Sequence, residues 1–212
     1  MIRLMLSDVR AKARWCYADE SSRGLLKVLL ADGTLAMLVY RMMQSARKHR
    51  LAPLEWFWNK FNVLAGGCII GRGAEFGPGF VLIHSMGVVI NGQVKGGSNI
   101  HIEHQVTIGA ERGRSPRLGD DLFIGAGAKI IGAVVIGSHT RIGANAVVIE
   151  DVPDYATAVG IPARVVRRQP RDRGAPHSLA PTRQDSMSFN ARDRAKSARN
   201  GLPLVHDVQV GP

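Results

Sequence analysis

Large apolar residues recur at every sixth position through the middle of the chain. In steps of six from Ile70 to Val148, thirteen of fourteen positions hold one, against an apolar content of 45% for the whole chain. Neither an α-helix, with a period of 3.6, nor an alternating strand repeats every six residues. Small residues such as Gly71 and Gly125 often follow the apolar position and let the chain turn. The pattern predicts a parallel β-helix with three short sides per coil and between four and five coils.

One repeat is interrupted at Arg112, where an apolar residue is expected. It lies in the arginine-rich stretch 111–117, and the six-residue phase resumes at Leu118. An insertion that leaves the phase intact is typical of a surface loop. We therefore expect a loop that projects from the β-helix and carries three arginines.

The first 64 residues show helical spacing instead. Leucines in the stretch 25–42 recur three and four positions apart, and Asp32-Gly33 interrupts them before Thr34, an expected N-cap. At least two helices are predicted. The aromatic stretch 54–61, just after the basic stretch 47–50, has two interpretations: it packs against the next domain, or it forms a patch that holds the protein to an anionic inner leaflet.

The end of the chain has no periodicity. From residue 167 on, nine Lys and Arg stand against four Asp, so that a net charge of +5 out of the chain's +11 lies there. Such a composition is typical of a disordered tail. A solvated tail is the more usual outcome than binding to nucleic acid. Three segments are thus predicted: a helical segment 1–64, a β-helix domain 65–168 and a basic tail 169–212.

Cysteine content and charge placement exclude several classes of protein. Cys16 and Cys68 are the two cysteines, too far apart for a zinc ribbon or a disulfide framework, which indicates a reducing cytoplasm. Charges within 1–14 break any secretory apolar region, and charges within 25–43 break any membrane span. A cytoplasmic protein is expected.

Several stretches together resemble one known family. The six-residue repeat, the stretches 80–91, 106–109 and 124–130, and the closing stretch 152–165 are similar to the serine acetyltransferase group of left-handed β-helix acyltransferases. Stretches 7–11 and 38–41 resemble the second half of that family's helical domain. In pattern the chain is most similar to truncated members that act in exopolysaccharide or colanic acid biosynthesis.

The resemblance implies an activity and a general base. Such enzymes transfer acetyl from acetyl-CoA to a hydroxyl acceptor, and they form homotrimers with each active site between neighbouring β-helices. By resemblance, His84 is the base. A hydroxyl that attacks a thioester needs a base that titrates near neutrality, together with backbone N–H groups for the oxyanion, and needs neither a metal nor an acyl-enzyme.

The resemblance also implies a site for acetyl-CoA. It places backbone contacts at Ala126 and Ala144, which are otherwise ordinary corner residues. Phosphates need cations, and the candidates are Lys129, Arg164 and Arg167.

Two further residues are expected near His84. With about eighteen residues per coil, Ile102 is expected over His84, His104 just beyond it and Glu103 over Ser85. His104 then either hydrogen-bonds near the site or fills a corner of the core. Glu103 is the nearest acidic candidate to orient His84, unless a neighbouring protomer supplies one.

Three departures from the family bear on the acceptor. Ile83 stands where serine acetyltransferases carry Asp, Ser115 stands where they carry a second active-site His, and the orienting carboxylate aligns with Ile69; Arg114 is retained. Without these acidic partners for a serine ammonium, a sugar hydroxyl in exopolysaccharide or capsule biosynthesis is the expected acceptor. L-serine is the alternative. A non-catalytic β-helix scaffold is the alternative of another class.

Overall fold

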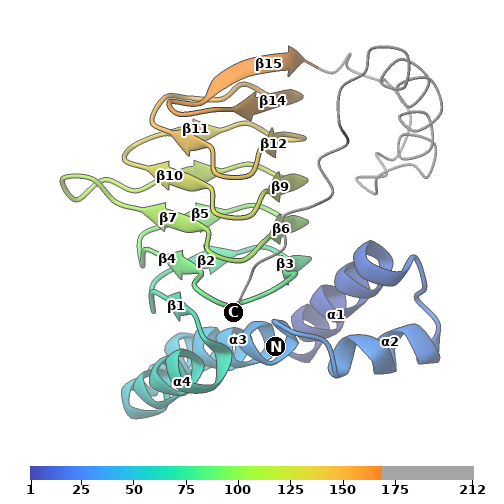
Figure 1. The fold of residues 1–212 in the computed structure, drawn as a ribbon. Coiled ribbons are helices and arrows are strands. Elements are labelled where there is room, and N and C mark those ends of the chain that lie inside the picture. Colours follow the sequence, from blue (N-terminus) through green and yellow to red (C-terminus); the bar gives the residue numbers. More distant parts are fainter. Residues whose placement is uncertain (169–212) are drawn as a thin grey trace, which may run out of the picture. The chain divides into compact units, whose positions relative to one another are not determined.

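The computed structural model describes residues 1–168, in which helices lie at one end of a stack of flat coils (Figure 1). The four helices are α1 Ile2–Tyr17, α2 Ser22–Leu29, α3 Thr34–Lys48 and α4 Ala52–Gly66. The predicted tail, 169–212, lies outside the described residues. The predicted fold class, mainly β with a parallel β-helix and a helical N-terminal extension, is confirmed.

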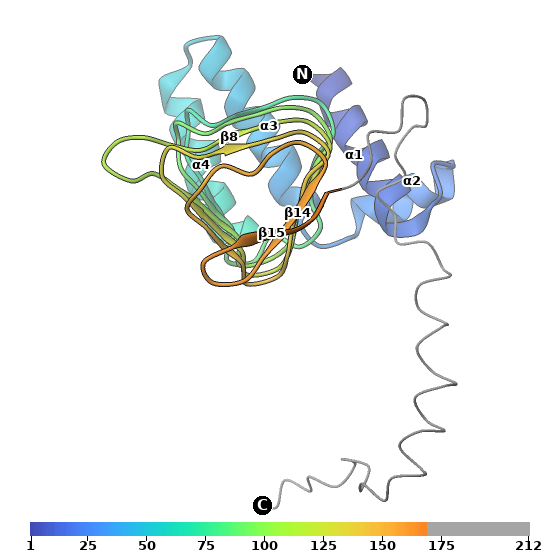
Figure 2. The same cartoon turned by 90° about the horizontal axis from the view of Figure 1, so that it is seen from above.

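In the described part of the chain, fifteen short strands form three sheets, one for each side of the coils (Figure 2). Sheet A contains β1 Ile69–Ile70, β4 Val89–Ile90, β7 Thr107–Gly109, β10 Lys129–Ile131 and β13 Val147–Val148. Sheet B contains β2 Glu75–Phe76, β5 Lys95–Gly96, β8 Arg117–Leu118 and β11 Val135–Ile136. Sheet C contains β3 Phe80–Leu82, β6 Ile100–Ile102, β9 Leu122–Ile124, β12 Arg141–Ile142, β14 Ala156–Val159 and β15 Arg164–Arg168. Every strand pair is parallel except β14 with β15.

The strand register corrects the predicted phase of the repeat. Leu82 pairs with Ile102, twenty residues on, and Ile108 pairs with Ile130, twenty-two residues on. Two residues are inserted after β3 and four after β7, which together make one full repeat. The six-residue phase is therefore restored at Leu118. Between the two insertions, each position that the six-residue repeat predicts lies two residues before the residue that pairs in the structure. The predicted positions there, such as Val88, are nevertheless buried.

The larger insertion forms the expected projecting loop. Glu111 and Arg114 form an antiparallel bridge, with Arg112 and Gly113 at positive φ between them. All four residues are exposed, and the loop stands out from the coils in Figure 1. The polar stretch thus avoids the core.

The start of α3 differs from the prediction. Gly33, at φ +75°, is the N-cap, and Thr34 is the first helical residue, whose hydroxyl donates to the carbonyl oxygen of Val28 at 2.6 Å. A Cβ at position 33 would lie 2.5 Å from the carbonyl oxygen of Leu82. Glycine is required here because the turn presses against β3 and adopts a backbone conformation that other residues disfavour.

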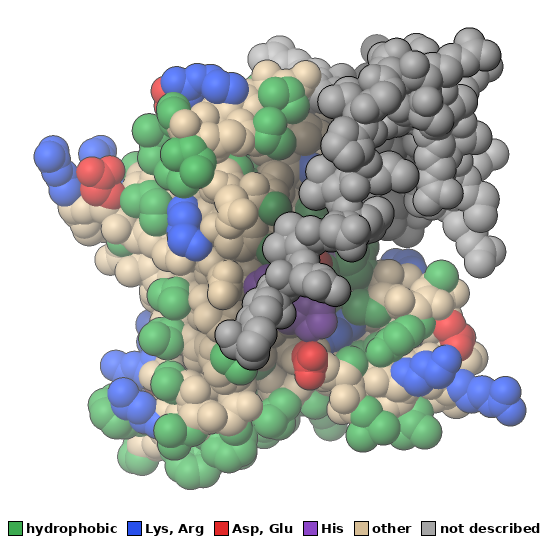
Figure 3. Space-filling model, in the orientation of Figure 1, with side chains coloured by type: hydrophobic (Ala, Val, Ile, Leu, Met, Phe, Trp, Pro, Cys, Tyr) green, Lys and Arg blue, Asp and Glu red, His purple; other side chains and the backbone are tan. Residues whose placement is uncertain are grey.

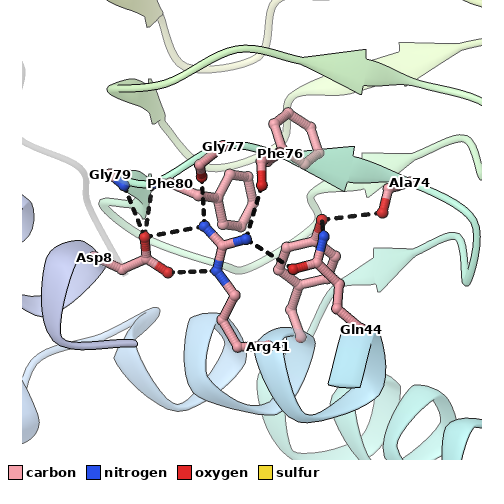
Figure 4. Close-up of polar contacts among 9 residues, drawn as sticks. Asp8, Arg41, Gln44, Ala74, Phe76, Gly77, Gly79 and Phe80 are labelled. Carbon is pink, nitrogen blue, oxygen red and sulfur yellow. Dashed lines mark hydrogen bonds and ion pairs between the residues drawn. The ribbon is translucent and has the colours of Figure 1, made fainter. Parts of the chain in front are cut away.

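A buried ion pair joins two helices to the first coil (Figure 4). Asp8 of α1 and Arg41 of α3 make two hydrogen bonds, of 2.7 and 3.0 Å, and each side chain is 1% exposed. The guanidinium also donates to the carbonyl oxygens of Phe76 and Gly77, and one Asp8 oxygen accepts from two backbone N–H groups of the same coil. Most hydrogen-bonding positions of both charges are thereby satisfied.

The aromatic residues of α4 include one that packs against the core and two that are exposed, so both interpretations of this stretch keep some support. Trp58 packs against the core, whereas Trp56 and Phe57 are each 55% exposed. Lys60 lies 4.8 Å from the centre of the Trp56 ring. Among residues 1–168, no helix is long and apolar enough to cross a bilayer.

We predict that Asp8→Ala lowers the free energy of unfolding by about 3 kcal/mol or more, because it leaves the buried Arg41 charge without its partner. Urea denaturation measures the change. Glu20→Ala removes the exposed partner of Arg14 and is the control, with a much smaller expected change because solvent screens this pair. Equal changes in the two variants would contradict the assigned role of the buried pair.

Candidate active site

His84 lies in a cavity of about 780 Å³ between the helices and the first two coils. The turn between α2 and α3 and the end of α4 form one wall, and the corners after β3 and β6 form the other. Its lining is largely apolar, and its polar members are Asp32, His84, Ser85, His104 and Gln105. Figure 3 shows histidine side chains on this face of the molecule.

His84 is accessible because it stands at a corner of the coil, outside the core. The corner after β3 is two residues longer than a regular corner and turns through Gly87, at φ +71°. His104 stands at the same place on the regular corner after β6 and has a side chain that is 45% exposed, so the corner position gives the access. The side chain of His84 is 51% exposed, as a base that meets a diffusing acceptor must be.

The register places four predicted site residues in one column. His84, His104, Ala126 and Ala144 each stand two residues after in-register residues of sheet C. The backbone hydrogen bonds from Gly127 to His104 and from Asn145 to Ala126 continue this ladder. The predicted base and both predicted acetyl-CoA contacts therefore share one corner of the β-helix, with a rise of roughly 4.8 Å per coil.

The same register corrects the expected neighbours of His84. His104, rather than Ile102, lies over His84, and the two ring centres are 6.0 Å apart. Glu103 lies over Ile83 rather than Ser85. The reason is that this coil has twenty residues where eighteen were expected. Glu103 Oε2 is 3.7 Å from Nδ1 of His104, so it accompanies the second histidine and not the first.

The carboxylate beside His84 comes from the helical segment. Asp32 Oδ2 lies 3.5 Å from Nδ1 of His84. Sequence reasoning treated Asp32-Gly33 only as a helix break, since a turn signal says nothing about what the turn faces. The contact spans 52 residues, and no local pattern reports it.

Lys12 hydrogen-bonds to the backbone on both sides of the contact between Asp32 and His84. Its side chain is fully buried, and its ammonium donates to the carbonyl oxygens of Asp32 and, at 2.8 Å, Leu82. Desolvation by burial lowers the pKa of Lys12 to about 8. One group thus joins the turn that carries Asp32 to the strand that leads to His84.

Arg114 and Ser115 are not brought to His84 within one chain. Both line a separate cavity of about 400 Å³ after β7, where Ser115 Oγ lies 2.9 Å from Oδ1 of Asn91. His84 precedes β4 and Arg114 follows β7, so they lie at opposite ends of the strands of sheet A.

The predicted phosphate partners have varied surroundings. Lys129 donates to the carbonyl oxygens of Gln105 and Gly127, both at 2.8 Å, and so braces the corner column. Arg164 Nη1 lies 3.4 Å from Oε2 of Glu150 at the surface. Arg167 lies in β15, where it pairs with Thr157. Within residues 1–168 no cluster of three metal-ligating side chains occurs.

Comparison with known proteins assigns the class first. Residues 115–150 match the model described as bacterial transferase hexapeptide (six repeats). A serine acetyltransferase of Helicobacter pylori is 37% identical over 155 residues, which cover 71% of this chain and 91% of the relative. One from Staphylococcus xylosus is 43% identical over 161 residues, which cover 72% and 73%. The chain belongs to the serine acetyltransferase family.

Solved structures agree with this assignment. A serine acetyltransferase of Neisseria gonorrhoeae superimposes with a TM-score of 0.73 at 32% identity, over 79% of this chain and 66% of that one. A serine acetyltransferase in complex with CoA has a TM-score of 0.70 at 31% identity, over 78% and 69%. This chain thus spans about two thirds of the length of the solved relatives.

Membership of this family confirms the predicted class of enzyme and contradicts the predicted acceptor. An acetyl-CoA-dependent acyltransferase is confirmed as the class of enzyme, with acetyl-CoA as co-substrate. The preference for a sugar acceptor and an exopolysaccharide role is wrong, because the relatives matched over most of the chain are serine acetyltransferases. That preference rested on Ile83, Ser115 and Ile69. Departures at three positions of the chain did not exclude the acceptor that these relatives use.

We predict that Lys12 makes stability rise with pH. Its ordinary pKa is 10.5, so between about pH 8 and 10.5 the unfolded chain binds more protons at this group than the folded chain. Urea midpoints between pH 7 and 9.5 should rise with pH in the wild type relative to Lys12→Met. Burial raises the pKa of Cys68 to about 12 and also raises that of Tyr40, but both groups act alike in the two proteins. Parallel pH profiles would contradict the prediction.

Proposed function

We propose that this protein transfers the acetyl group of acetyl-CoA to the side-chain hydroxyl of L-serine. The observation that carries the proposal is the shared column of His84 and the corner residues Ala126 and Ala144. It sets the proposed base at one end of a column whose far end consists of two alanines, beside which an extended cofactor fits. The acceptor is inferred from the relatives, which are named serine acetyltransferases.

The reaction follows from the chemistry of His84. The neutral imidazole takes the hydroxyl proton while the oxygen attacks the thioester carbonyl carbon, and a C–O bond forms. The tetrahedral intermediate then collapses, the C–S bond breaks, and the CoA sulfur takes the proton from His84. O-acetylserine and free CoA result, and protons and electrons balance without an acyl-enzyme.

Acetyl-CoA is proposed to lie along the corner column. Ala126 and Ala144 lie about 10 and 14 Å above His84 at the usual strand spacing. Neither residue has a side chain beyond Cβ, so a ligand can reach the backbone. Lys129, Arg164 and Arg167 are proposed partners of the phosphates.

A homotrimer would complete the site. His84 and the Arg114 loop lie at opposite ends of the strands of sheet A, at two different corners of the β-helix. In a ring of three copies, one of these corners faces the other corner of the neighbouring copy. Arg114 and Ser115 of one protomer would then approach His84 of the next. Arg114 carries the positive charge that a serine carboxylate requires.

Action in the cytoplasm is part of the proposal, since acetyl-CoA and free serine are both available there. Association with the inner face of the membrane has no support from the relatives. Its basis among the described residues is the exposed basic stretch 47–50 together with the exposed Trp56 and Phe57.

We predict that the wild type releases CoA thiol from acetyl-CoA in the presence of L-serine and that His84→Ala lowers kcat roughly 100- to 10,000-fold. The thiol-release assay measures both, with a panel of sugars as competing acceptors. His49→Ala, at the exposed end of α3, is the control and should keep wild-type kcat. Turnover with sugars alone, or an active His84→Ala variant, would refute the proposed function.

We predict that Ala144→Glu raises the KM for acetyl-CoA about tenfold or more, because a carboxylate on the column blocks and repels the cofactor. The KM for serine should change little. Ala52→Glu, which adds the same charge at the start of α4, should keep the wild-type KM values. An unchanged KM for acetyl-CoA in Ala144→Glu would place the cofactor elsewhere.

A further inference from the structure

We propose that Asp32, in the turn between α2 and α3, is the positioning residue that orients His84 for catalysis. Its carboxylate accepts the N–H of His84 Nδ1, which leaves Nε2 as the basic nitrogen. The inference rests on the proposed function in taking His84 as the base. It gives the helical segment a direct part in the reaction.

The surroundings of His84 single out this carboxylate. Asp32 is the one acidic residue in the lining of the cavity, among the residues that the structure describes. Its Oδ2 lies 3.5 Å from His84 Nδ1, whereas the Glu103 carboxylate lies 3.7 Å from Nδ1 of His104. Ile69, at the position where the family is expected to carry an orienting carboxylate, is apolar and half exposed.

The backbone on both sides of this contact is held in place. Lys12 donates one hydrogen bond to the carbonyl oxygen of Asp32 itself and another to that of Leu82, two residues before His84. Gly33 packs against the same Leu82 carbonyl, with no room for a Cβ. The Asp32 side chain is 83% exposed, yet its Cα is held relative to the His84 corner. A carboxylate on a fixed backbone can orient a ring even near solvent.

The pairing has a defined chemical consequence. A neutral imidazole carries one N–H, and the hydrogen bond at one nitrogen decides that the other holds the free electron pair. With Nδ1–H directed to Asp32, Nε2 takes the proton from the acceptor hydroxyl. The carboxylate then lies beside the imidazolium until the proton passes to the CoA sulfur. Removal of Asp32 should therefore impair proton transfer rather than binding.

The first test separates kcat from KM. We expect Asp32→Ala to lower kcat for acetyl transfer to L-serine roughly 10- to 100-fold, with the KM for both substrates within about twofold of wild type. Asp121→Ala is the matched control, because Asp121 makes a similar contact of 3.3 Å with His139 outside the cavity. It should keep the wild-type kcat. A raised KM for serine with an unchanged kcat would assign Asp32 to acceptor binding and overturn the proposal.

The second test does not depend on the acceptor. Nitrogen-15 NMR of the histidine rings gives the tautomer of His84 at a pH where the ring is neutral, without substrate. We expect the Nδ1–H tautomer to predominate in the wild type and in Asp121→Ala, and to lose that predominance in Asp32→Ala. The same tautomer populations in Asp32→Ala and the wild type would overturn the proposal. If the wild type fails to acetylate serine, the proposed function fails, while the tautomer still decides the pairing of Asp32 with His84.

Discussion

The in-register stacking of parallel coils is the constraint on which the rest of this structure depends. Once the strands pair, the number of residues in each coil decides at which corner a side chain lies and in which coil of the stack. His84, His104, Ala126 and Ala144 share a column because the coils between them contain twenty, twenty-two and eighteen residues. Extra residues are tolerated only at corners, where they leave the ladder intact. The two insertions lengthen the corner that carries His84 and produce the projecting arginine loop.

The orientation of the helices depends on their contacts with the first coil. Arg41 donates two hydrogen bonds to Asp8, and both side chains bind backbone groups of residues 76–80, so both helices meet the β-helix in one orientation. Replacement of such a pair by apolar residues is often neutral for stability, and its contribution here is to geometry. Lys12 extends this network from α1 to the turn that carries Asp32. The buried polar groups thus link the helical segment to the active site.

The sequence predicted the repeating parts better than the contacts between distant parts. A period of six has one structural explanation, so the β-helix, its number of coils and the projecting loop followed from it. The position of Glu103 did not, because an average of eighteen residues per coil hides a two-residue insertion. Thr34 was misplaced as an N-cap since the tight approach of Gly33 to Leu82 is tertiary. His84 was found through family motifs, whereas Asp32 has no motif and is recognised only when the helices are folded against β3.

The most direct test of the proposed reaction is a structure of the protein with CoA and L-serine bound. We expect CoA to lie along the column of Ala126 and Ala144 with its sulfur near His84, and the serine hydroxyl to face Nε2 of His84 while Asp32 contacts Nδ1. Arg114 of a neighbouring protomer should meet the serine carboxylate. CoA bound on another face of the β-helix, or serine bound away from His84, would refute the proposed site.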